Sequence, residues 1–323
     1  MRAEDVLVTG GTGFLGRRLC RRLDADGCRV GVLSRRERPP ADLDDAVSAW
    51  HVGDVRDADA VDAAVAAHDA VFHLAGVGLA DADPQTVESV NRDGTRVLLD
   101  ACREHETERV VFASTAGTRR APGRRPATES DLAKPVGAYQ TSKLDAERLV
   151  ADYVSDGGDA VTVHPTSVVG PGDEYFTGRL CRLVTGRIPV YLPGGASFVG
   201  VDDAVGGIAA AMRGGRRGEH YLLGGENLTY GEALEVFADA AGPADDPPSV
   251  RVPASVVRAA GPAVGAVNAA LGTRFFPVNT RMARLATETL FYDSSKARRD
   301  LGYDPAPLDE HVDEAVAWWR ERV

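Results

Sequence analysis

The fold is decided near the start of the chain by the stretch V-L-V-T-G-G-T-G-F-L-G at residues 6–16. Its apolar opening predicts a short strand, and the spacing of the apolar residues behind it predicts a helix. Glycines at a strand-to-helix turn let the backbone pass close to a pyrophosphate, whose charge the free N–H groups of the helix then bind. The G-x-x-G-x-x-G spacing of Gly10, Gly13 and Gly16 therefore predicts a dinucleotide site, with a plain tight turn as the alternative.

Short apolar and β-branched runs predict five further strands, most of them followed by a helical pattern. They lie at residues 29–33, 49–52, 70–74, 109–113 and 160–164, and one long helix is predicted at residues 84–105. Strands that alternate with helices are typical of a parallel sheet covered by helices on both faces. The sequence therefore predicts an α/β fold with a Rossmann-type doubly wound parallel sheet.

The alternation weakens after residue 170, and Pro and Gly become frequent between residues 186 and 200. We therefore expect a smaller C-terminal substrate-binding domain. It would consist of residues 171–197 and 226–323, with approximate bounds. Residues 1–170 and about 198–225 would form the dinucleotide-binding domain, since a chain of 323 residues is long enough for one large and one smaller unit.

The residues that follow the predicted strands indicate which cofactor is bound. An acidic residue after the second strand would bind the ribose 2′-hydroxyl of NAD, but Arg35 and Arg36 stand there, and arginine suits the 2′-phosphate of NADP. We therefore expect NADP, with NAD less favoured; a solvated arginine pair is the alternative. Asp54 can accept a hydrogen bond from the adenine amino group, or it can serve as an ordinary turn or N-cap residue. Ala75 and Gly76 are small enough for the cofactor ribose to approach the backbone.

The segment Y-Q-T-S-K at residues 139–143 predicts a site of proton transfer. Tyr139 and Lys143 share one helical face at i and i+4, and a nearby ammonium favours the phenolate, so the pair can exchange a proton with a carbinol oxygen. The alternative is an exposed pair on an ordinary helix. Only three of the 37 basic residues are lysine, so a lysine here is unusual for a merely solvated cation.

Thr115, at the end of the fifth strand, can donate a hydrogen bond to a substrate carbonyl oxygen or belong to an ordinary turn.

Composition limits the possible partners. The net charge of −11 opposes binding to nucleic acid or to an anionic membrane, and the apolar segment at residues 252–271 is interrupted by Arg, Gly-Pro and Asn, against a membrane span. The chain enters directly into a strand pattern, so we expect no signal peptide and a cytoplasmic location. Four scattered cysteines predict neither disulfides nor a metal site; they are Cys20, Cys28, Cys102 and Cys181.

Taken together, these motifs resemble the extended short-chain dehydrogenase/reductase family, within the NAD-dependent epimerase/dehydratase superfamily. The motifs span most of the chain: T-G-G-T-G-F-L-G at 9–16, G-D-V at 53–55, H-L-A-G at 73–76, Y-Q-T-S-K at 139–143 and H-P-T-S-V-V-G-P-G-D at 164–173. Two branches look similar, the dihydroflavonol-reductase-like carbonyl reductases and the hopanoid-associated sugar epimerases.

The resemblance implies roles for individual residues. It places the acid-base tyrosine at Tyr139, its lysine at Lys143 and the hydroxyl donor at Thr115, where serine is commoner in the family. It implies a cofactor site made of Gly10, Gly13, Phe14, Leu15, Gly16, Arg35, Arg36, Asp54, Val55, Leu74, Ala75, Gly76, Ser114, Tyr139, Lys143, Pro165, Thr166, Ser167 and Val168.

The activity that we expect is NADP-dependent transfer of hydride between the nicotinamide and a carbonyl or secondary alcohol of a small organic substrate. The alternatives are an NAD(P)-dependent sugar or sugar-nucleotide epimerase and a non-catalytic NADP-binding regulator. Sugar-nucleotide dehydratases carry an Asp-Glu pair after the catalytic hydroxyl, but Ala116-Gly117 stand here, which argues against dehydration. By analogy with the family, a homodimer is a further expectation.

Overall fold

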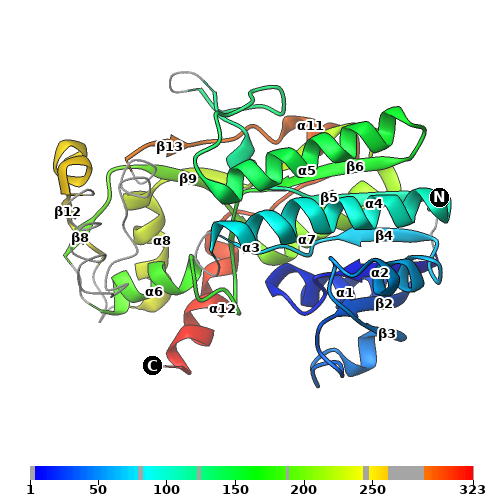
Figure 1. The fold of residues 1–323 in the computed structure, drawn as a ribbon. Helices are drawn as coiled ribbons and strands as arrows, with labels where there is room; N and C mark the ends of the chain where they lie inside the picture. The colour runs from blue at the N-terminus through cyan, green and yellow to red at the C-terminus, as the bar shows by residue number, and fades with distance from the viewer. Residues whose placement is uncertain are drawn as a thin grey trace.

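The centre of the molecule is a seven-stranded sheet in the order β10-β6-β5-β4-β1-β2-β3 (Figure 1). The computed structural model describes residues 4–78, 83–121, 125–186, 189–242, 247–260 and 287–322. Every neighbouring pair of strands in this sheet is parallel. The strands are β1 (Asp5–Thr9), β2 (Arg29–Ser34), β3 (Ala49–Val52), β4 (Ala70–His73), β5 (Arg109–Ala113), β6 (Ala160–Pro165) and β10 (His220–Leu223). The predicted Rossmann-type α/β fold is confirmed.

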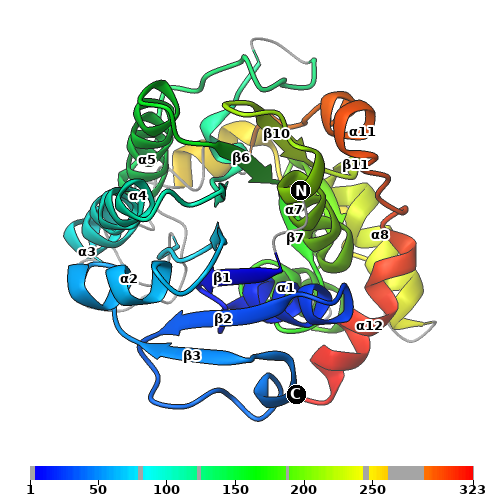
Figure 2. The ribbon, with the colours of Figure 1, turned by 90° about the vertical axis from the view of Figure 1, so that its right-hand side faces the viewer.

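Helices cover both faces of this sheet (Figure 2). On one face lie α1 (Phe14–Ala25), α7 (Val201–Gly214) and α11 (Ser295–Leu301); on the other lie α2 (Ala58–Val65), α4 (Gly94–Glu104) and α5 (Ala138–Ser155). Successive side chains of a strand point to opposite faces. Val6 and Val8 of β1 accordingly enter the core under α1 and α7, whereas Leu7 enters the core under α4 and α5.

A second, smaller sheet lies beside the first. It joins β7 (Ser167–Val169), β9 (Gly195–Gly200), β11 (Glu226–Thr229) and β13 (Thr289–Leu290), and α6 (Thr177–Thr185), α8 (Tyr230–Ala241) and α12 (Asp309–Arg320) share a core with it. A short pair of β8 (Val190–Tyr191) and β12 (Val250–Arg251) lies apart from it. The chain crosses from the first sheet to the second at Thr166, between β6 and β7. The proposed domain bounds remain a prediction, because residues 243–246 and 261–286 lie outside the described part of the chain.

The helix predicted at residues 84–105 is interrupted. α3 (Pro84–Glu88) continues into a π-helical turn, Ser89–Asp93, before α4 begins. In this turn the buried Asn91 accepts from Val77 N at 2.8 Å and donates to Val77 O at 3.1 Å and to Ser142 Oγ at 3.0 Å. Such turns place one extra residue in the helix and are frequent at functional sites. Asn91 thus ties the segment after β4 to α5.

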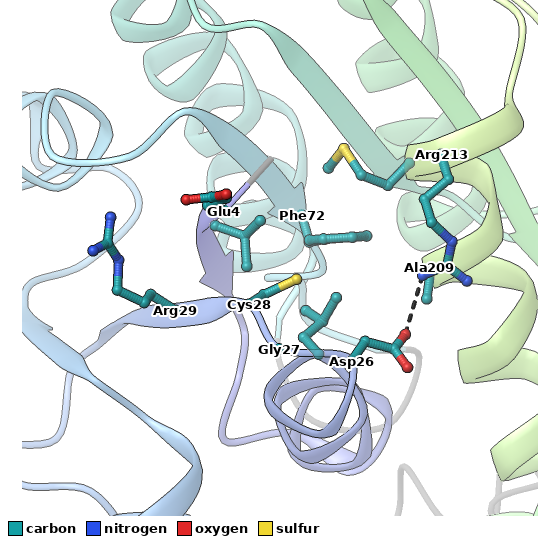
Figure 3. Close-up of a pocket in the computed structure, with 11 residues that line it drawn as sticks. Glu4, Asp26, Gly27, Cys28, Arg29, Phe72, Ala209 and Arg213 are labelled. Carbon is teal, nitrogen blue, oxygen red and sulfur yellow. Dashed lines mark hydrogen bonds and ion pairs between the residues drawn. The ribbon is translucent and has the colours of Figure 1, made fainter. Parts of the chain in front are cut away.

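A cavity of about 520 Å³ lies at the amino-terminal edge of the central sheet (Figure 3). Its floor includes Phe72 of β4, and its rim carries the ion pair of Asp26 with Arg213 at 3.0 Å. Ligands of such sheets bind at the opposite, carboxyl-terminal edge. In the part of the chain that the structure describes, no helix combines the length and the apolar character needed to cross a membrane.

Replacing Gly16 with alanine should destabilise the protein by about 1–3 kcal/mol, because the added Cβ would lie 2.1 Å from Gly10 O. Gly206, inside α7, is the matched control: an added Cβ would meet only Arg22 Nη1 at 3.9 Å, so Gly206→Ala should stabilise by up to about 1 kcal/mol. Urea unfolding of both variants measures the difference. Equal stabilities would contradict the close packing of the glycine turn.

Candidate active site

The carboxyl ends of β1, β4, β5 and β6 meet at one edge of the sheet, and the glycine turn after β1 lies among them. Gly10 has a φ of +74°, and a Cβ there would lie 2.7 Å from Ala75 N and from the carbonyl carbon of Leu74. Gly13 caps α1 without any side-chain hydrogen bond, so no side chain takes up the N–H groups of the first turn. A tight turn and an uncapped helix N-terminus fit the pyrophosphate of a dinucleotide.

Two exposed arginines follow β2 beside this turn. Arg35 and Arg36 have no ion-pair partner among the described residues, although most of the arginines nearby do, and Trp50 Nε1 donates to Arg36 O at 2.8 Å. The structure also adds a residue that the sequence reasoning missed. Arg56 binds both oxygens of Asp54, at 2.8 and 2.9 Å, and this hydrogen-bonded pair lowers the pKa of the Asp54 carboxyl.

Asp54 is therefore not the N-cap of α2. That position belongs to Asp57, whose side chain accepts from the backbone N–H groups of Asp59 and Ala60. A spacing of two residues between an aspartate and an arginine after a strand is a weak signal, which explains why the pair of Asp54 and Arg56 was not foreseen. The adenine contact of Asp54 stays a prediction.

A chain of hydrogen bonds fixes the end of β4. Thr9 Oγ1 lies 2.7 Å from His73 Nδ1, and His73 Nε2 lies 3.0 Å from Thr95 Oγ1, which in turn donates to Asn91 O at 2.6 Å. Burial lowers the pKa of His73 to about 3, so this imidazole is neutral at physiological pH. Beyond it, a Cβ at Gly76 would come within 3.2 Å of Lys143 Nζ. The small residue therefore leaves the space in front of the lysine open.

Thr115 and Tyr139 meet at the end of β5. Thr115 Oγ1 accepts from Gly117 N at 3.1 Å, so its own proton is available to donate, and the side chain lies close enough to Tyr139 to lower the pKa of the phenol. Tyr139 is half-buried in the first turn of α5, which begins after Gly137 at a φ of +94°. Burial raises the pKa of Tyr139, and the nearby Thr115 hydroxyl opposes this rise.

Lys143 lies behind this pair and is 5% exposed. Its Nζ donates to Ala113 O at 2.9 Å and lies 5.1 Å from the centre of the Phe112 ring. Burial lowers the pKa of Lys143 to about 8, and the negative charge of Glu147 opposes this change. The structure thus brings together the three residues that the sequence marks as catalytic candidates.

Behind the site lies a buried polar cluster that the sequence did not predict. Arg119 Nη1 lies 2.9 Å from Glu147 Oε2, and these side chains are only 2% and 4% exposed. Arg119 Nη2 lies 3.0 Å from His220 Nδ1 and 3.4 Å from His164 Nε2. Glu147, His164 and His220 have the proximity of metal ligands, but the guanidinium of Arg119 already lies among them and supplies the cation. Glu147 stands at helical spacing after Lys143, which is the signal that could have revealed it.

The remaining predicted cofactor residues line the same edge or support it. Phe14 lies 3.5 Å from the position of a Cβ on Gly172, so it faces the loop after β7, and Leu15 packs on the sheet core. Pro165, Thr166, Ser167 and Val168 form the crossing between the two sheets. The side chain of Val55 is buried against Gly94, and the Ser114 hydroxyl donates to Glu147; the cofactor contacts of these two residues stay a prediction.

Acid should destabilise the protein through His73. The folded state keeps this imidazole neutral down to a pH of about 3, whereas the unfolded chain takes up the proton below about pH 6.5, so stability is lost as the pH falls through this window. At pH 5 the loss is about 2 kcal/mol relative to pH 7.5. Urea unfolding of the wild type and of His73→Gln at both pH values measures it. A variant as sensitive to acid as the wild type would contradict the prediction.

Known proteins are similar to this chain in sequence and in fold. The model of the NAD dependent epimerase/dehydratase family matches residues 6–224. "Sterol demethylase protein B" of Methylococcus capsulatus is 33% identical over 331 residues, which cover 98% of this chain and 98% of that protein. "Putative dihydroflavonol 4-reductase" of Synechocystis sp. is 30% identical over 98% of this chain and 95% of that protein.

A solved structure extends the likeness to three dimensions. UDP-glucose 4-epimerase of Thermus thermophilus in complex with NAD aligns with a TM-score of 0.78 and 25% identity, over 98% of this chain and 99% of that chain. The glycine turn, the buried lysine and the hydroxyl pair thus stand in a chain that matches the family over most of its length. The chain belongs to the NAD dependent epimerase/dehydratase family of extended short-chain dehydrogenases/reductases and is an NAD(P)-dependent enzyme.

Proposed function

We propose that the protein is an NADP-dependent carbonyl reductase, which transfers hydride between the nicotinamide and a carbonyl or secondary alcohol of a small organic substrate. The observation that carries this proposal is the meeting of Thr115 and Tyr139 at the end of β5, where the buried Lys143 donates to Ala113 O. Two hydroxyls directed at one point suit a single oxygen atom that gains negative charge and then a proton.

NADPH, when bound, supplies the hydride for the carbonyl carbon. Thr115 donates a hydrogen bond to the carbonyl oxygen and stabilises the charge that grows there. Tyr139 gives its proton to the same oxygen, so the ketone, the hydride from the cofactor and the proton from the enzyme together yield an alcohol. Lys143 adds a positive charge one helical turn away, which favours the phenolate left on Tyr139, and its ammonium would also hold the ribose hydroxyls.

The residues that would hold the cofactor belong to the strand ends described above. The glycine turn and the N-terminus of α1 would bind the pyrophosphate, and Arg35 and Arg36 would bind the 2′-phosphate. In support of NADP, these two arginines are exposed and carry no ion pair among the described residues, and no acidic side chain stands at the end of β2.

A sugar epimerase is the second candidate, since the solved neighbour with 25% identity carries that activity in its name. Such an enzyme would retain its cofactor through reduction and reoxidation. A dehydratase is disfavoured because Ala116 and Gly117 follow Thr115, so no carboxylate stands there to act as acid or base in an elimination.

Replacing Tyr139 with phenylalanine should reduce turnover at least about 1,000-fold, because the proton donor is removed. The dissociation constant for NADPH should stay within about threefold of the wild-type value. The assay follows NADPH absorbance at 340 nm with a panel of aliphatic, aromatic and polycyclic ketones. Tyr153→Phe, on the same helix but buried in the core away from the site, is the matched control and should keep its activity. Full activity of Tyr139→Phe would refute the assignment.

Replacing Arg35 with serine should weaken NADPH binding about 10- to 100-fold, because a charge-assisted hydrogen bond to the 2′-phosphate is lost. NADH binding should not change. Fluorescence titration with both cofactors measures the effect, and Arg148→Ser on the exposed side of α5 is the control. An equal loss for NADH and NADPH would show that Arg35 does not read the 2′-phosphate.

A further inference from the structure

Glu147 continues the row of reactive side chains on α5. Tyr139, Lys143 and Glu147 are spaced by four residues, so they follow one another on the same face of the helix. α5 packs on β6, and Lys143 and Glu147 reach the end of β5 through Ala113 O and Ser114 Oγ. An unpaired carboxylate in such a place would be very unfavourable, and Glu147 is accordingly surrounded by donors. Because Glu147 is buried, it does not serve to keep a surface soluble, and its burial calls for another role.

The donors to Glu147 flank Thr115 in the chain. Ser114 Oγ donates to Glu147 Oε1, Thr118 Oγ1 lies 2.8 Å from the same oxygen, and Arg119 pairs with the other oxygen. Glu147 thus binds Ser114, directly before Thr115, and Thr118, three residues after it. The short segment between these two contacts contains Thr115, the hydroxyl donor of the proposed reaction.

His164, on β6, binds the backbone of Thr115. Its Nδ1 lies 3.1 Å from Thr115 O, and because a carbonyl oxygen can only accept, the Nδ1 proton must be the one that is donated. The Nε2 atom is then an acceptor and faces Arg119 and His220. Burial and the positive charge of Arg119 lower the pKa of His164 well below its ordinary value, so this imidazole is neutral. Thr115 is therefore held through its backbone as well as through its neighbours.

We propose that Glu147 is a positioning residue of the reaction: it fixes the strand end that carries Thr115, and its charge keeps the buried Lys143 protonated. This inference rests on the proposed roles of Thr115, Tyr139 and Lys143. Glu147 touches neither substrate nor cofactor and acts only through these residues.

The charge of Glu147 is the main one that supports the ammonium. Titratable and charged groups face Lys143 from several elements: Tyr139 and Glu147 from α5, His73 from β4, His164 from β6, and Arg119 from the β5–α5 connection through its ion pair with Glu147. Both histidines are neutral at physiological pH and the phenol is uncharged. Without Glu147, burial and the unpaired Arg119 would both favour the neutral amine.

The test measures Lys143 directly. The chain has only three lysines, so protein labelled with ¹³C at the lysine Cε gives three resonances, and Lys143→Arg identifies the one of interest. Its pKa is read by NMR titration in the full-length protein, without any substrate. The variants are Glu147→Gln, which removes the charge, Glu147→Asp, which retains it, and Arg148→Gln as an exposed control on the same helix. The double variant Arg119→Gln/Glu147→Gln also removes the guanidinium that would lose its partner, and it is used in place of Glu147→Gln if the single variant does not fold.

The Lys143 pKa should fall by at least about one unit in Glu147→Gln, less in the double variant, and by under half a unit in Glu147→Asp and Arg148→Gln. With a ketone that the wild type reduces, kcat of Glu147→Gln should fall at least about 10-fold at pH 7, while KM for NADPH changes less than about threefold. As the pH is raised, the activity of Glu147→Gln should fall at a lower pH than that of the wild type, because Lys143 loses its proton earlier.

An unchanged Lys143 pKa in Glu147→Gln, or a kcat equal to that of Arg148→Gln, would overturn the proposal. This failure is distinct from failure of the proposed function. If Tyr139→Phe remained fully active, the catalytic assignment would be lost, whereas the NMR titration would still decide whether Glu147 holds the charge of Lys143.

Discussion

The constraint on which the site depends is the burial of the Lys143 ammonium. A charge removed from water is unstable unless protein groups replace the lost hydration. Here a backbone carbonyl at the end of β5 accepts from Nζ, the Phe112 ring lies beside it, and Glu147 supplies a negative charge one turn further along α5. The helix must therefore lie against β5 in one register, and that register also places Tyr139 beside Thr115.

The parallel sheet determines where the chemistry occurs. Because all seven strands run in one direction, the glycine turn after β1, Gly76 after β4 and Thr115 after β5 end at the same edge. The helix N-terminus beside Gly13 adds a positive end that needs an anion. The fold thus brings the cofactor-binding glycine turn close to Tyr139, although the two are more than a hundred positions apart in sequence. The crossing at Thr166 then brings the second sheet next to this edge.

Much of this arrangement could be predicted from sequence, because it follows from local patterns. The strands, the glycine turn and the pair of Tyr139 and Lys143 all have short-range signals. The π-helical turn at Asn91 could not be foreseen, since it depends on a contact with Val77 that no periodicity records. A glutamate next to Arg148 is typical of a solvated surface, so the neighbours of Glu147 in sequence do not predict its burial. Its spacing of four residues from Lys143 is a weak signal, and the tertiary contact with Arg119 shows that it is buried.

The central claim is that this enzyme binds NADP and consumes it in a redox reaction with an external carbonyl compound. The most direct test is the cofactor state of the purified protein: the nucleotide released on denaturation, its rate of exchange, and the dissociation constants of the emptied protein for NADPH and NADH. The account predicts exchangeable binding with a clear preference for NADPH. Firmly retained NAD that does not exchange would contradict it and would favour the epimerase.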